Sequence, residues 1–182
     1  MDENENLVIA DPSGLFYKVG QRKYFVSTRL SLTHKESGKM TIKDKVSFLD
    51  RILPLIKKYI DVDLSLVQFR FCDLKDRKGR AFPDRIEFSV PHIKTKLQMI
   101  TVTAHELVHI EQYQQKRLKF EYTKNFENIY TVFEGKDYPY LDDMPFDYEF
   151  TDDDLKKYNN QPWEKEAIKR QRLIQKEVRK LI

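Results

Sequence analysis

The chain of 182 residues contains a single cysteine, Cys72. One thiol excludes an intramolecular disulfide and a zinc site built from several cysteines, so Cys72 is predicted to pack within a strand. Glycine is also scarce, at 5 residues, and the 7 prolines do not gather into a linker. We find no internal repeat. The sequence therefore predicts a single domain, residues 15–182, preceded by a loose N-terminal segment, residues 1–14.

Long hydrophobic runs are absent as well. No segment approaches the roughly 18 apolar residues that cross a bilayer. Residues 1–14 are acidic, whereas a secretory signal peptide begins with basic residues. The sequence thus favours a protein with no membrane span and no signal peptide, in the cytoplasm or inside a virion.

A strong excess of one charge is missing too, because 33 Lys and Arg residues face 29 Asp and Glu residues, for a net charge of +4. Acidic residues concentrate between 142 and 154. Basic residues gather in two places, which are Lys75, Arg77, Lys78 and Arg80, and then Lys165, Lys169, Arg170 and Arg172. Such clusters are usually solvated faces, so nucleic acid is not the favoured partner. A protein or peptide substrate is expected, and the oligomeric state is not indicated.

Histidine is rare, with 4 residues, yet two of them fall in one pentapeptide, His105-Glu106-Leu107-Val108-His109. A random chain of this composition would contain His-Glu-x-x-His about 0.6 times per hundred chains. Residues four apart share one face of a helix, so both imidazoles can reach a single Zn²⁺. Glu106 then lies beside the metal, where a carboxylate can take a proton from water. The pentapeptide predicts a zinc-dependent hydrolase, and among these a peptidase.

The surrounding sequence predicts a long helix from Lys94 to Phe120, which contains no Gly or Pro. Apolar residues at helical spacing give this helix a buried face, formed by Leu97, Ile100, Ala104, Leu107 and Val108. Further helices are expected near 41–60 and from Pro162 onward, with a helical turn at 151–158. Strands are expected within residues 15–32 and 125–140. A hairpin is expected from residues 64–72 and 85–90, with an exposed edge at its second strand. The fold class is therefore α+β, with a small mixed or antiparallel sheet.

A catalytic zinc site needs a third protein ligand. A metzincin-like sequence would continue to Gly at 112 and His at 115, where this chain has Gln112 and Gln115. The SprT-like pattern of DNA-repair proteases needs a later histidine, and none follows His109. The two remaining histidines, His34 and His92, precede the helix and are predicted to be structural or exposed. The third ligand should therefore be a carboxylate.

Two carboxylates, Glu164 and Glu166, lie at the start of the final helix. They point about 200° apart around the helix axis, so only one of them can bind the metal. The apolar stripe of this helix, which includes Trp163 and Ala167, lies between them. Geometry on its own leaves both open.

Two motifs resemble the gluzincin metallopeptidases, and more narrowly the small HExxH proteins, many of bacterial or phage origin, in which HELxHxxQ is followed by a helix with E-x-x-A. Here these motifs are residues 105–112 and 164–167, within about a third of the chain. The resemblance implies a zincin-like fold and favours the first of the two carboxylates. The roles that it implies are His105, His109 and Glu164 as zinc ligands, Glu106 as the base, and Ala167 as the small residue between the two helices.

The predicted function is a zinc metallopeptidase that hydrolyses peptide bonds by Glu-assisted attack of water. The tetrahedral oxyanion needs a further donor, for which the first candidate is Tyr158, with Tyr122, Tyr130 and His92 as others. Gln112 is a candidate partner for a ligand imidazole. The alternative function is a non-catalytic metal-binding structural or interaction protein, for example a virion-associated one. A scaffold, however, has no chemical need for Glu106.

Overall fold

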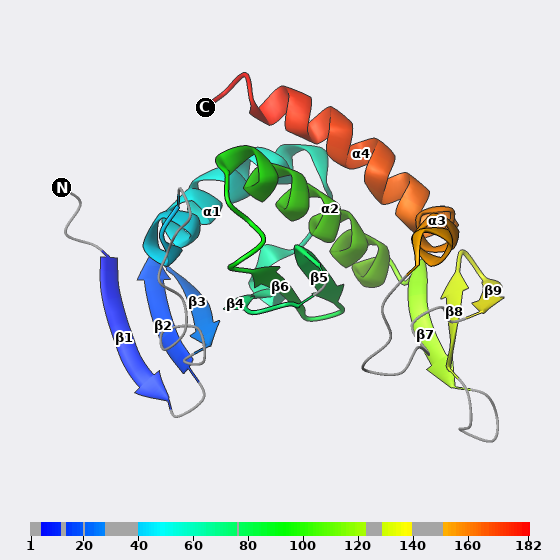
Figure 1. Ribbon diagram of the computed structural model, residues 1–182, viewed down its shortest axis with the longest axis horizontal. Coiled ribbons are helices and arrows are strands. Elements are labelled where there is room, and N and C mark those ends of the chain that lie inside the picture. Colours follow the sequence, from blue (N-terminus) through cyan, green and yellow to red (C-terminus); the bar gives the residue numbers. More distant parts are fainter. Residues whose placement is uncertain are drawn as a thin grey trace.

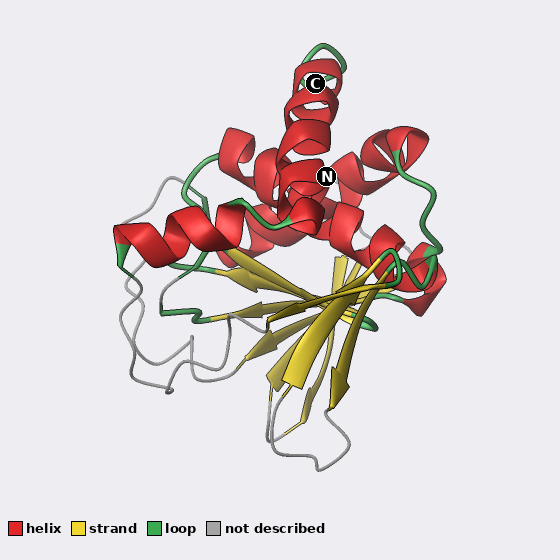
Figure 2. Cartoon of the chain, turned by 90° about the vertical axis from the view of Figure 1, so that its right-hand side faces the viewer, coloured by secondary structure: helices red, strands yellow, loops and turns green. Residues whose placement is uncertain are grey.

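The computed structural model describes residues 5–11, 14–19, 21–27, 40–75, 77–122, 129–139 and 151–182. It contains two sheets, and the helices gather on one side of the strands (Figures 1 and 2). The predicted α+β class is confirmed. In the described residues, no helix combines the length and the apolar character that crossing a membrane requires.

The larger sheet has six strands in the order β1-β2-β3-β4-β6-β5. Neighbours pair antiparallel except for the two central pairs, β3 with β4 and β4 with β6, which are parallel. The strands are β1 (Glu5–Asp11), β2 (Gly14–Val19), β3 (Arg22–Ser27), β4 (Gln68–Cys72), β5 (Gly79–Phe82) and β6 (Arg85–Ser89). Among the described strands, the antiparallel β5 therefore forms one free edge of the sheet.

Two expectations for this sheet differ from the structure. The hairpin predicted from 64–72 and 85–90 is wrong, because β4 and β6 run parallel and β5 is the antiparallel partner of β6. The exposed edge accordingly belongs to β5 and not to β6. At the other edge of the sheet, β1 pairs with β2.

Three helices pack together above the sheet, and local signals explain where each begins. At the start of α1 (Ile42–Ile56), Thr41 and Asp44 form a capping box. Thr95 caps α2 (Lys96–Gln114), and Pro162 opens α4 (Pro162–Val178), where its missing N–H costs no hydrogen bond. A shorter helix, α3 (Asp152–Asn159), precedes α4.

The helix α2 ends earlier than the sequence predicts, at Gln114 instead of Phe120. Lys116 adopts a positive φ of 58°, which reverses the chain into β7 (Leu118–Tyr122). This strand joins β8 (Ile129–Phe133) and β9 (Lys136–Pro139) in a three-stranded antiparallel sheet. The early stop thus places the second sheet next to the C-terminal end of α2 (Figure 1).

Most of α2 is enclosed by the sheet on one side and by α1 and α4 on the other. Ile100, Ala104, Leu107 and Val108 are buried as predicted, whereas Leu97 in the first turn is 42% exposed. Ala167 on α4 is fully buried. The pentapeptide His105–His109 therefore lies on the most enclosed of the described helices.

Candidate metal centre

Three side chains from two helices converge at one point. His105 and His109 lie one turn apart on α2, and Glu164 lies in the first turn of α4. The two Nε2 atoms are 3.1 Å apart, and each is 3.2 Å from an oxygen of the Glu164 carboxylate. A tetrahedral zinc ion with bonds of about 2.0–2.1 Å separates neighbouring donor atoms by about 3.3 Å. The spacing of the three donors therefore fits a zinc ion.

Hydrogen bonds at Nδ1 of the two histidines determine that each imidazole turns its Nε2 toward the other donors. Nδ1 of His109 lies 2.9 Å from Oε1 of Gln112, whose amide nitrogen donates to the carbonyl of Trp163 at 3.2 Å. The Gln112 oxygen must then accept from the Nδ1–H of His109. His105 makes the same contact with Oε1 of Gln171, also at 2.9 Å. Both Nε2 atoms consequently present lone pairs toward the carboxylate, an arrangement that requires a cation or a proton between them.

Without a metal, a proton takes this place. Burial lowers the pKa of His109, but the charge and the hydrogen bond of Glu164 outweigh burial and raise the pKa to about 9. Burial also acts on Glu164, in the direction of a higher pKa, yet the two imidazoles hold the pKa of this carboxyl well below its ordinary value. The centre therefore favours a positive charge at His109 and a negative charge at Glu164, and a divalent cation can take the place of the proton.

Glu106 lies beside this triad on α2 and is buried. Burial raises the pKa of Glu106, and the nearby positive charges of His105, His109 and Arg77 oppose the rise. A raised pKa makes a carboxylate a stronger proton acceptor, as a general base requires. Access to the centre is on the side of His105, whose side chain is 20% exposed, against 7% for His109 and 2% for Glu164.

The free edge of the sheet approaches Glu106 closely at Gly79. A Cβ atom at this position would lie 2.7 Å from Oε1 of Glu106 and 2.5 Å from Cγ1 of Val102. Only glycine lets the start of β5 come this near to α2 without displacing these side chains. Arg77, two residues earlier, adds a weaker positive charge that acts with the two histidines to lower the pKa of Glu106.

Glu166, the other candidate ligand, points into a network of ion pairs and also has a side-chain hydrogen bond with Gln112. Its carboxylate accepts hydrogen bonds from Arg117 at 2.7 and 3.1 Å and from Arg170 at 3.3 Å. Arg170 also contacts the buried carboxylate of Glu111 on α2 and donates to the carbonyl of Tyr59. The network fastens α4 to α2, so Glu164 is the carboxylate that the structure brings to the histidines.

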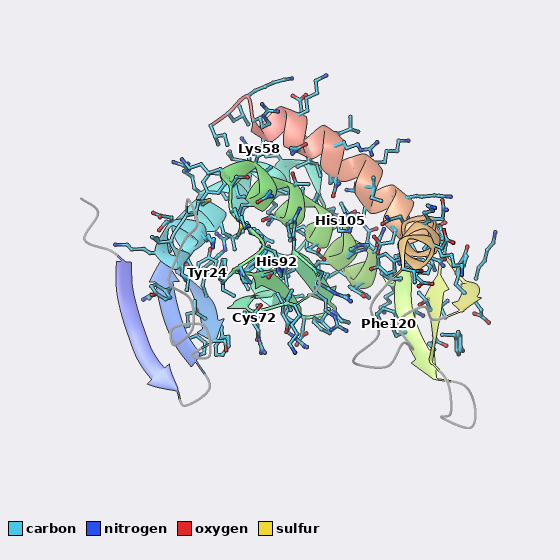
Figure 3. All side chains as sticks on the ribbon, in the orientation of Figure 1. Tyr24, Lys58, Cys72, His92, His105 and Phe120 are labelled. Atoms are coloured by element: carbon cyan, nitrogen blue, oxygen red, sulfur yellow. The ribbon has the colours of Figure 1, made fainter. Side chains whose placement is uncertain are left out.

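The candidate oxyanion donors are spread over the molecule. Tyr158, half-buried in the last turn of α3, precedes Glu164 by six residues, and its role as an oxyanion donor stays a prediction. Tyr130 donates to Glu121 across β7 and β8, and the side chain of Tyr122 lies outside the described residues. His92 bonds Ser89 before α2 begins (Figure 3). The role of His92 as an oxyanion donor stays a prediction.

Sequence reasoning anticipated Gln112 but missed three residues of this region, namely Gln171, Gly79 and Arg77. Gln171 follows Glu164 by seven residues, a spacing that marks one helix face but identifies no partner. His34 lies outside the described residues. Comparison of the chain with protein-family models, with curated proteins and with solved structures found no significant match.

Proposed function

We propose that this protein is a zinc-dependent peptidase. The observation that carries the proposal is the convergence of two imidazole nitrogens and one carboxylate at 3.1–3.2 Å, with a buried carboxylate beside them. Two histidines and one glutamate form a donor set of catalytic zinc sites, in which the fourth position stays open. The partial exposure of His105 supports an accessible position of this kind.

When bound, zinc would polarise the carbonyl of the substrate and lower the pKa of the attacking water. His105, His109 and Glu164 would hold the ion, and Gln112 and Gln171 orient the imidazoles. Glu106 accepts the proton of the attacking water at its carboxylate and returns it to the leaving amine. Burial raises the pKa of Glu106, which makes its carboxylate a stronger base toward the attacking water.

Glu106 also distinguishes this proposal from a metal-binding scaffold. A protein that only binds the metal needs the three ligands and no further carboxylate. Burying Glu106, which is not a ligand, costs desolvation free energy without strengthening metal binding. Its position next to the free edge of β5 supports a role toward a substrate, since an extended peptide can pair with such an edge.

The test uses purified protein loaded with one equivalent of zinc and an unfolded protein as substrate. The wild type should cleave the unfolded protein, and cleavage should stop when a chelator is added. Glu106→Gln should retain zinc and lose cleavage by at least about a hundredfold, the usual contribution of general base catalysis. A wild type that binds zinc tightly but cleaves neither the protein nor a peptide library would leave the scaffold as the function.

A further inference from the structure

A pocket of about 320 Å³ opens beyond the C-terminal end of α2. One wall is the turn after β5, and the other is the chain that leads from α2 into β7, where Figure 3 labels Phe120. The lining residues are Pro83, Tyr113, Lys116, Leu118, Lys119 and Phe120. No residue of the pocket belongs to the metal centre.

The pocket and the metal centre share two elements. On α2, Tyr113 follows His109 by four residues, as His109 follows His105, so all three lie on one helix face about 6 Å apart along the axis. On the sheet, β5 starts with Gly79 against Glu106 and ends next to Pro83. The free edge of β5 therefore leads from the metal centre to the pocket.

The pocket is apolar inside and basic at its rim. Leu118 is buried, and the rings of Tyr113 and Phe120 pack with their centres 6.0 Å apart. Phe120 is nevertheless 46% exposed, so its ring is accessible to a ligand from outside the protein. Lys116 and Lys119 are exposed beside it. This lining suits a large apolar side chain with a negative charge nearby.

We propose that this pocket is a specificity subsite that binds a large apolar side chain, aromatic by preference, of a peptide substrate with an acidic neighbour. The inference rests on the proposed peptidase function. An extended peptide advances about 3.3 Å per residue. The pocket begins about 6 Å beyond His109, so it receives the side chain about two to three residues from the scissile bond.

The first experiment compares cleavage of peptides that carry Phe, Leu, Ala or Gly at successive positions around one cleavable bond. The wild type should prefer Phe at one position two or three residues from the bond. Phe120→Ala should lower kcat/KM for the Phe peptide about tenfold and leave the Gly peptide unchanged, a typical effect of one apolar contact. The matched control is Leu173→Ala, which removes an exposed apolar side chain from a separate pocket on α4. Equal preference in the wild type and Phe120→Ala would overturn the proposal.

The second experiment needs no turnover. Hydroxamate peptides that differ only in a benzyl group at the favoured position are titrated into the zinc-loaded protein. The benzyl group should strengthen binding to the wild type and to Leu173→Ala, but not to Phe120→Ala. Lys119→Glu should weaken binding of a peptide that has Asp next to the benzyl-bearing residue. The control, Lys165→Glu, should not weaken it. Zinc binding without cleavage would refute the peptidase, whereas a benzyl group without effect on any variant would refute the subsite.

Discussion

Replacing Gln171 by Leu should weaken zinc binding although Gln171 is no ligand. Its side-chain oxygen accepts the Nδ1–H of His105 at 2.9 Å and so keeps Nε2 free for the metal. The variant leaves this N–H without its partner and lets the ring adopt the other tautomer or turn away. Leucine has a similar volume, so the change removes the hydrogen bond more than the packing.

The size of the effect follows from the contact. A neutral hydrogen bond contributes about 1 kcal/mol net, and loss of a partner that orients a metal-bound imidazole usually costs about 10–100-fold in affinity. His105 is 20% exposed, so water can replace part of the lost contact. We therefore expect the lower end, about a tenfold rise in the zinc Kd, which corresponds to about 1.4 kcal/mol.

The assay is competition with a chromogenic chelator at constant pH, and Gln175→Leu is the matched control. Gln175 lies one turn further along α4 and donates to Thr101 Oγ1 of α2, so it joins the same two helices without touching a histidine. Its replacement should lower stability and leave the zinc Kd unchanged. If both variants weaken zinc binding equally, Gln171 only holds the helices together, and the argument from the tautomer fails.

Three further changes test other parts of the centre. Glu164→Gln should lower zinc affinity by at least about a hundredfold, whereas Glu166→Gln should keep the metal and lower the melting temperature, because it loosens Arg117 and Arg170. The zinc content of each variant is measured after dialysis. Loss of zinc from Glu166→Gln alone would make Glu166 the ligand. Gly79→Ala should lower the free energy of unfolding by about 1–3 kcal/mol in denaturant titrations and impair hydrolysis, because the added Cβ would clash with Glu106 and Val102. A variant with unchanged stability and activity would contradict this close approach. In zinc-free protein the folded pKa of His109, about 9, exceeds its ordinary 6.5, so its contribution to stability is complete below pH 6.5 and disappears as the pH rises through 9. Glu164 acts oppositely, because its lowered pKa preserves its contribution above pH 4.5 and loses it only in stronger acid. In thermal melts, the zinc-free wild type should therefore lose stability between pH 6.5 and 9 relative to Glu164→Gln. Over the same range the stabilisation by added zinc should grow, since the metal competes with the proton. Parallel pH profiles of the two proteins would refute the interaction between His109 and Glu164.

The parts of this centre that the sequence predicts are those encoded over a few residues. The pentapeptide that ends at His109 needs only helical spacing to bring its imidazoles together, and Pro162 and Thr41 mark helix starts through local capping. The strand pairing was not predictable in the same way. Whether β4 meets β6 in a parallel or antiparallel sense depends on contacts across the sheet, and both strands have the same apolar alternation. The stop of α2 depended on one backbone conformation at Lys116.

The choice of carboxylate illustrates why the rest of the site needed the structure. Glu164, Ala167 and Gln171 are spaced by three and then four residues, so they lie on one face of α4. That face meets α2, where the buried Ala167 permits a close approach and the two polar residues reach the histidines. Glu166 is on another face, where Arg117 and Arg170 neutralise it. The metal centre is therefore a property of the α2–α4 pair, since the pentapeptide supplies two of the three donors and α4 supplies both the remaining donor and the amide that orients His105.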